Sequence, residues 1–147
     1  MLIILGILGG FIVFVVILCV IVFSILNKQK NADYYTLGSD RIASVKSVIG
    51  VRDITSTSAT AQNGVTTKSY DYRSTTSTDD ILKYVTYLVD EEGFAPAVLN
   101  QNSSQPVYTK RSFEEDKILL LTMSDTGFGY TLTIQKGEGS LTVTEQE

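Results

Sequence analysis

The sequence predicts an α+β protein: an N-terminal transmembrane helix is followed by one small domain, an antiparallel sheet with one main helix packed on it. Three observations predict this fold class. Residues 2–26 form an uncharged apolar run, residues 78–92 carry apolar side chains at helical spacing, and several later stretches alternate apolar with polar side chains. The expected element order in the domain is α-β-β-α-β-β-β, over residues 39–147.

Residues 2–26 are the predicted membrane span. Of these residues, 20 are Leu, Ile, Val or Phe and none is charged. As a helix the run is about 37 Å long, which exceeds the roughly 30 Å hydrocarbon core of a bilayer. At about −0.4 kcal/mol per apolar residue, insertion is favourable by about 8 kcal/mol. We therefore expect an uncleaved anchor over residues 1–27, with the lipid bilayer as its partner.

Gly6 and Gly10 are candidate residues for helix dimerisation. Their GxxxG spacing lets two helix backbones approach closely, which would produce a homodimer through the span. The alternative is that glycines are simply frequent in membrane helices. Cys19 is interpreted as a membrane-buried thiol, because the bulky Leu18 does not suit the cleavage site of a lipoprotein.

Two patterns disagree about which side of the membrane carries the domain. Lys28 and Lys30 follow the span and no basic residue precedes it, which by the positive-inside rule favours a cytoplasmic domain. Residues 27–147 contain 30 Ser or Thr and no Cys, which is typical of exposed domains outside bacterial cells. We expect an extracytoplasmic domain, with the cytoplasmic placement as the alternative.

The first half of the domain is expected to hold a helix and a hairpin. Residues 28–38 are polar without periodicity and are expected to form a juxtamembrane linker. A short helix is expected from Ser39 to Gly50, with a strand as the second choice. The strands 51–58 and 65–73 flank Asn63-Gly64, a dipeptide that favours a tight hairpin turn.

The main helix is expected to begin at Ser77 or Thr78 and to stop at Gly93. The strands expected after it are residues 94–99, 107–112, 117–123, 127–136 and 140–144. Ile118–Leu121 is apolar without alternation and is expected in a central strand. The last long strand should place one face in the core and leave a Thr-rich face in water; its core residues would be Phe128, Tyr130, Leu132 and Ile134.

Composition excludes several classes of function. The net charge is −4 and the basic residues are not clustered, which disfavours a nucleic-acid partner. His is absent throughout and Cys is absent after residue 19, so no metal site is expected. Neither GxxxxGK[ST] nor GxGxxG occurs, and we expect no cofactor.

Two groups of residues are candidates for partner binding. Asp90, Glu91 and Glu92 end the main helix, where anions oppose the helix dipole; the alternative is a solvated helix end near a basic residue. Tyr70 and Tyr72 share a strand face and can dock a partner or stack on a sugar, the alternative being a place in the core under the main helix.

A second acidic cluster, residues 114–116, is expected in a turn between strands. Together with Asp90–Glu92 it raises an alternative function, a small carboxylate-dependent hydrolase acting on an envelope polymer, which would need the two clusters to face one cleft. We expect instead a non-enzymatic, membrane-tethered binding or accessory module, with no catalytic residue. Its partner would be a protein or an envelope polymer, met through the open sheet face or the hairpins.

The runs TSTDDILKYVTYLVDEEGF and KILLLTMSDTGFGYTLTIQKGEGSL carry a resemblance. Over residues 40–144 the chain resembles the extracytoplasmic domain of small single-pass membrane-anchored proteins of Gram-positive bacteria. The shared pattern is an acidic helix start, Gly-Phe after the helix and a Gly-Tyr-Thr-like final strand. The resemblance implies an extracytoplasmic location and no catalytic residues.

Overall fold

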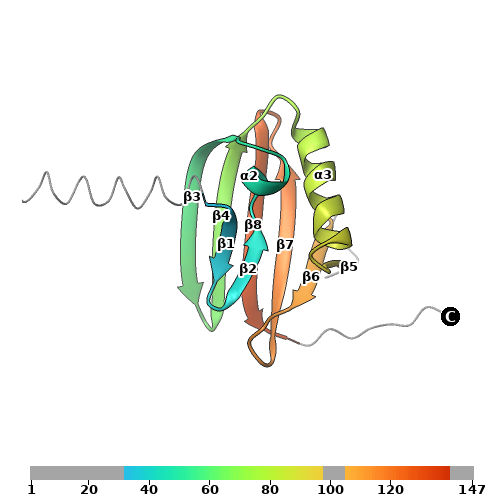
Figure 1. The fold of residues 1–147 in the computed structure, drawn as a ribbon. Coiled ribbons are helices and arrows are strands. Elements are labelled where there is room, and N and C mark those ends of the chain that lie inside the picture. The colour runs from blue at the N-terminus through green and yellow to red at the C-terminus, as the bar shows by residue number, and fades with distance from the viewer. Residues whose placement is uncertain (1–31, 98–104, 140–147) are drawn as a thin grey trace, which may run out of the picture. The chain divides into compact units, whose positions relative to one another are not determined.

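The computed structural model of the protein describes residues 32–97 and 105–139. The chain divides into two units, Met1–Ala32 and Asp33–Glu147. The described residues of the second unit form two antiparallel sheets and two helices (Figure 1). They confirm the predicted class, an α+β domain built on an antiparallel sheet.

The larger sheet has six strands, all antiparallel to their neighbours. In spatial order the strands are β3 (Asp53–Gln62), β4 (Val65–Arg73), β8 (Gly129–Glu138), β7 (Lys117–Asp125), β6 (Val107–Arg111) and β5 (Ala95–Ala97). The apolar run Ile118–Leu121 lies in β7, which has a strand on each side, as expected. Among the described strands, β3 and β5 are therefore the two edges of this sheet.

One face of this sheet carries all the other elements (Figure 1). They are the two-stranded sheet of β1 (Tyr34–Leu37) and β2 (Asp40–Ala43), the short helix α2 (Val45–Val48) and the long helix α3 (Ser77–Asp90). The core lies between these elements and the sheet, and α3 contacts β7 and β8. Burial of that single face accounts for the alternation of apolar and polar residues along the strands.

The linker and first helix expected before residue 50 are largely wrong. Tyr34–Leu37 is a strand, and Tyr35 and Leu37 on it are 4% and 1% exposed. Asp40–Ala43 pairs with it and places Ile42 in the core. Helix forms only from Val45, capped by Ser44, whose side chain accepts a hydrogen bond from the Ser47 N–H. Of the apolar residues at helical spacing, Ile42 thus lies in a strand, and Val45 and Val48 lie in a single helical turn.

The β3–β4 hairpin forms where Asn63-Gly64 predicts it. Asn63 and Gly64 have φ angles of 51° and 77°, the positive values that a tight two-residue turn requires. β3 continues to Gln62, beyond the expected end at Ser58, because it remains paired with β4 up to the turn. The hairpin is therefore longer than the sequence pattern indicated.

Helix α3 follows the predicted range and buries the predicted stripe. Tyr84 and Leu88 are fully buried against the sheet. The helix ends at Asp90, three residues before Gly93, which was expected to stop it and has a positive φ of 74°. The expected caps Ser77 and Thr78 are wrong, because the N-cap position is Thr76 and its side chain makes no capping hydrogen bond.

Strand β8 separates a core face from a polar face, as predicted. Tyr130, Leu132 and Ile134 are fully buried. On the other face Thr133 hydrogen-bonds Ser69 of β4 at 3.0 Å. The core position expected for Phe128 is wrong, because that residue belongs to the β7–β8 turn and is 89% exposed.

Several predictions fall outside the described residues. They concern the membrane span over residues 2–26, with Gly6 and Gly10, the strand over residues 140–144, and the last two residues of the strand over 94–99. Within residues 32–97 and 105–139, no helix has the length and apolar character needed to cross a membrane.

Candidate functional site

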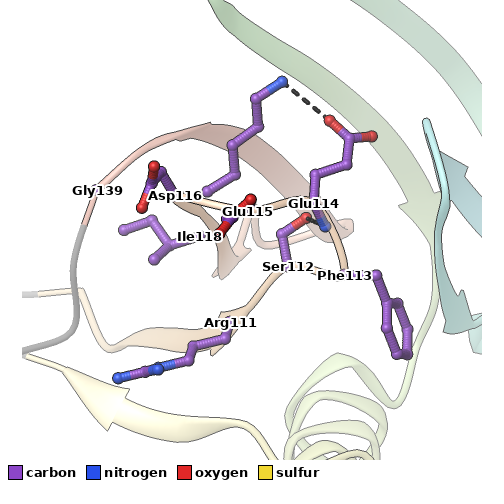
Figure 2. A pocket seen from close by; sticks show the side chains of 9 residues that line it. Arg111, Ser112, Phe113, Glu114, Glu115, Asp116, Ile118 and Gly139 are labelled. Atoms are coloured by element: carbon purple, nitrogen blue, oxygen red, sulfur yellow. Dashed lines mark hydrogen bonds and ion pairs between the residues drawn. The ribbon is translucent and has the colours of Figure 1, made fainter.

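The turn between β6 and β7 lines a hollow of about 540 Å³ (Figure 2). This turn contains residues 114–116, which confirms the expected position of the second acidic cluster. The lining residues are Arg111, Ser112, Phe113, Glu114, Glu115, Asp116, Lys117, Ile118 and Gly139. Charges of both signs therefore surround a partly apolar hollow.

A buried ion pair lies directly beneath this turn. Lys136 on β8 and Asp40 on β2 are 5% and 1% exposed, and the Lys136 Nζ lies 2.7 Å from the Asp40 Oδ2. Lys136 also donates to the Leu37 carbonyl at 2.9 Å. Burial raises the pKa of the Asp40 carboxyl, but the hydrogen bonds from Lys136, Ser112 and the Phe113 N–H outweigh it and hold that pKa below 3.8. The pair stays ionised at neutral pH.

Asp40 holds the backbone of the turn in place. Its Oδ2 accepts a hydrogen bond from the Ser112 hydroxyl at 2.6 Å, and its Oδ1 accepts one from the Phe113 N–H at 2.8 Å. The Ser112 Oγ in turn accepts a hydrogen bond from the Glu114 N–H at 2.9 Å. A carboxylate of the smaller sheet therefore fixes consecutive residues of the β6–β7 turn.

Glu114 links the turn to two lysines. Its carboxylate pairs with Lys136 and, at 2.9 Å, with Lys117. Hydrogen bonds from Lys136 and Lys117 and from the Ser39 N–H lower its pKa to about 2. Glu114 is therefore an anion at every physiological pH and serves to hold the turn.

Phe113 extends from this fixed turn into solvent. Its side chain is 78% exposed although its backbone N–H bonds the buried Asp40. Figure 2 shows the ring turned away from the Glu114 carboxylate. A large apolar side chain on a rigid turn is the usual anchor of a protein interface, since little ordering entropy is lost on binding.

Glu115 and Asp116 leave negative charge at the hollow uncompensated. Both are exposed, and no ion pair among the described residues engages either carboxylate. Arg111, on the opposite side of the hollow, is also exposed. Glu115 and Asp116 therefore share an exposed turn with Phe113.

The predicted acidic cluster at the end of α3 is divided. Asp90 and Glu91 are exposed, whereas Glu92 is partly buried. The Glu92 carboxylate accepts a hydrogen bond from the Ala43 N–H at 2.9 Å and lies 3.4 Å from the Lys110 Nζ. Glu92 thus ties the helix end to β2 and β6, in line with the alternative of a helix end near a basic residue.

The two acidic clusters do not share the hollow at the β6–β7 turn. The hollow at the β6–β7 turn is lined by residues 114–116 and by none of Asp90, Glu91 or Glu92. A glycosidase needs a carboxyl with a raised pKa to act as the acid, and the pKa of Glu114 is shifted downward. The Glu114 carboxyl at this hollow therefore does not have the raised pKa of such an acid.

Tyr70 and Tyr72 lie in the core, which is the alternative to a docking role that their sequence pattern left open. They are 6% and 5% exposed, so neither offers a surface to a partner. The Tyr72 hydroxyl hydrogen-bonds that of Tyr35 on β1, and its ring stacks on Tyr130. The β1–β2 sheet, which the sequence reading did not foresee, covers these tyrosines and removes them from solvent.

The sequence singled out residues 114–116 of this site but not Asp40, Phe113 or Lys136. The position of Lys136 nevertheless indicated burial, because Lys136 follows Leu132 and Ile134 at every second residue of β8 and so lies on the same face of the sheet. A lysine on the core-facing side of a strand needs a buried anionic partner. Identifying Asp40 as that partner required the fold.

No protein-family model, curated protein or solved structure matches this chain. Within the described ranges, 32–97 and 105–139, no group of three or more His, Cys, Asp or Glu side chains is placed to hold a metal ion.

Proposed function

We propose that this protein is a membrane-tethered, non-enzymatic binding or accessory module whose domain lies outside the cytoplasm. We further propose that it docks a protein partner through the β6–β7 hairpin. The observation that carries the proposal is Phe113, 78% exposed on a turn that the buried Asp40 holds in place.

The anchoring part of the proposal is supported by the sequence of residues 2–26. An uncharged run with 20 Leu, Ile, Val or Phe residues favours insertion into lipid by about 8 kcal/mol. The Ser- and Thr-rich, cysteine-free composition of the rest of the chain supports the extracytoplasmic side. Tethering confines the domain near the membrane and raises its effective concentration toward a partner in the same membrane.

The docking part of the proposal is supported by the energetics of the turn. A buried ion pair contributes little net stability compared with apolar residues of the same volume. In this domain the pair orders the turn backbone. Because the turn is already ordered in the free protein, binding of a partner loses little conformational entropy there. Phe113 then contributes its apolar area on binding, and Glu115 and Asp116 orient a basic partner.

Site-specific photo-cross-linking tests the proposal in native membranes. The photo-reactive residue p-benzoylphenylalanine replaces Phe113 in one variant and Phe128 in a matched control, since Phe128 is at least as exposed but lies on the β7–β8 turn. We expect a discrete polypeptide adduct several-fold stronger from position 113 than from position 128. Equal adducts at both positions, or an adduct that is a glycan polymer, would contradict a protein partner at this hairpin.

An affinity measurement with the adduct's polypeptide completes the test. Phe113→Ala should weaken binding about 30-fold, the loss of about 2 kcal/mol typical of an aromatic anchor. Phe128→Ala should leave the affinity unchanged. Asp40→Asn should weaken binding less than Phe113→Ala, because it frees the turn and leaves the ring present.

A further inference from the structure

The two edges of the six-stranded sheet differ in how they are protected. β5 has three residues, and its central residue, Pro96, has no N–H to offer. β3 has ten residues, and nine of its residues are registered against β4 on its inner side. Short strands and prolines are common means of blocking an edge, and β3 uses neither.

The outer side of β3 presents unpaired backbone groups. In an antiparallel strand, alternate residues direct their N–H and C=O groups away from the neighbour. Among the described residues, no backbone hydrogen bond outside the β3–β4 ladder involves any residue from Asp53 to Gln62. The edge is therefore a template for one more strand.

The side chains of β3 do not oppose pairing. Its register shift lies between Ile54 and Ser56, and the ladder is regular from there to the turn. Residues 56–62, STSATAQ, contain no charge and no proline, and six of the seven are exposed. Charged side chains, lysine above all, are the usual guard of an exposed edge, and this segment has none.

We propose that β3 pairs antiparallel with β3 of a second copy of this chain, joining the two six-stranded sheets into one. A two-fold axis through the segment places residues 56–62 of one copy opposite the same segment of the other, so that only the residue on the axis faces its own equivalent. Two copies that each carry a net charge of −4 repel, and an uncharged strand is where they can approach without facing like charges. The small Ser, Thr and Ala side chains also permit close approach on both faces.

The occupant is a second copy because two copies of this uncharged segment meet without opposing like charges, and its small side chains let both strands approach closely. The pairing does not depend on the proposed partner site, since Phe113 lies on the β6–β7 turn and β3 is a terminal strand of the sheet. It is also separate from a dimer through Gly6 and Gly10.

Disulfide cross-linking of the full-length protein in its native membrane tests this pairing. Cys19, the single cysteine, is replaced by Ser, and one cysteine is then introduced at each position from 56 to 62. Residues facing each other across an antiparallel pair bring their Cβ atoms close enough for a disulfide. We expect oxidised dimers with one maximum inside the segment, where the two-fold axis passes, and lower yields on either side.

Ala95→Cys on β5 is the control for random collision, because it is an exposed position on the opposite edge. Equal yields from β5 and β3, or no dimer from any position in β3, would overturn the proposal. A cross-link from β3 to a different polypeptide would overturn the choice of a second copy.

A charge variant adds a test that does not depend on disulfide geometry. Thr60→Lys places like charges near each other across the paired edges and should reduce the cross-linking yield at position 58 at least tenfold, with partial recovery in high salt. Thr60→Ser should leave the yield unchanged. A dimer held by the membrane span alone would respond to neither variant, and an unchanged yield in Thr60→Lys would contradict β3 pairing.

Discussion

The Lys136 Nζ lies 2.7 Å from the Asp40 Oδ2, with both side chains almost completely buried. This contact joins the last strand of the six-stranded sheet to the small sheet that covers it. The same carboxylate orders the β6–β7 turn through Ser112 and Phe113. One buried ion pair therefore connects the packing of the two sheets to the shape of the proposed binding surface.

Replacing one member of this ion pair should destabilise the domain more than replacing both members together. Lys136→Met leaves Asp40 buried without its cation, and we expect a loss of about 3 kcal/mol in the free energy of unfolding. The double variant Asp40→Leu with Lys136→Met should lose less than the sum of the two single variants. Urea unfolding of all four proteins measures the coupling, and strict additivity would contradict the role of the pair.

The buried tyrosines Tyr130 and Tyr84 should respond differently to loss of the hydroxyl. The Tyr130 hydroxyl is buried with no hydrogen-bond partner among the described residues, whereas the Tyr84 hydroxyl donates to the Ala43 carbonyl at 2.6 Å. Tyr130→Phe should be neutral or stabilising by up to about 1 kcal/mol. Tyr84→Phe should cost about 1–2 kcal/mol because it leaves a carbonyl unpaired. Thermal unfolding compares the two variants, and equal effects would contradict the difference in hydrogen bonding between the two hydroxyls.

Stability should fall on both sides of a broad neutral plateau. Hydrogen bonds from Arg52 lower the pKa of Asp80 below 3.8, and lysines lower that of Glu114 from 4.5 to about 2. A depressed folded-state pKa stabilises above the unfolded value, so this stability is lost as pH falls from about 4.5 toward 2.

In alkali the buried tyrosines act in the opposite sense. Burial raises the pKa of Tyr72 and Tyr84 above the ordinary 10.0, so the folded state favours the neutral ring and stability is lost as pH rises beyond 10. Between about pH 5 and pH 9 the melting temperature should stay level, because the chain has no His to titrate there. Melting curves across the whole range measure this, and a steep slope near pH 6.5 would contradict it.

Membrane orientation can be decided with a thiol reagent. In a Cys19→Ser background, Phe128→Cys introduces one exposed cysteine on the β7–β8 turn. We expect labelling in intact cells by an impermeant maleimide, because the domain is proposed to be extracytoplasmic. Labelling that appears only after the cells are opened would support the cytoplasmic alternative that Lys28 and Lys30 favour.

Local signals predicted some elements well. The Asn63-Gly64 turn and the range of α3 are set by residues close together in the chain, and both appear as expected. The alternation along β8 predicted the buried Tyr130, Leu132 and Ile134. These patterns work because a turn, a helical stripe and a strand face each depend on neighbours within a few residues.

The failures came where distant parts of the chain decide the outcome. Ile42 and Val45 stand at helical spacing, yet pairing with Tyr34–Leu37 draws Asp40–Ala43 into a strand. That pairing gains stability only when the β1–β2 sheet covers Tyr70 and Tyr72, which lie on a strand much later in the sequence. Tertiary burial therefore overrode a weak local preference.

By itself the sequence determined the α+β class, the antiparallel strands and the main helix, since composition and periodicity are properties of contiguous residues, and the apolar anchor stays a prediction. The tertiary structure decided which charges became structural, placing Lys136 over Asp40 and leaving Phe113 and the outer side of β3 exposed. The physical reason is that a buried ion pair, a covered tyrosine or a free strand edge is defined by what lies next to it in space. Those neighbours are brought together only by folding.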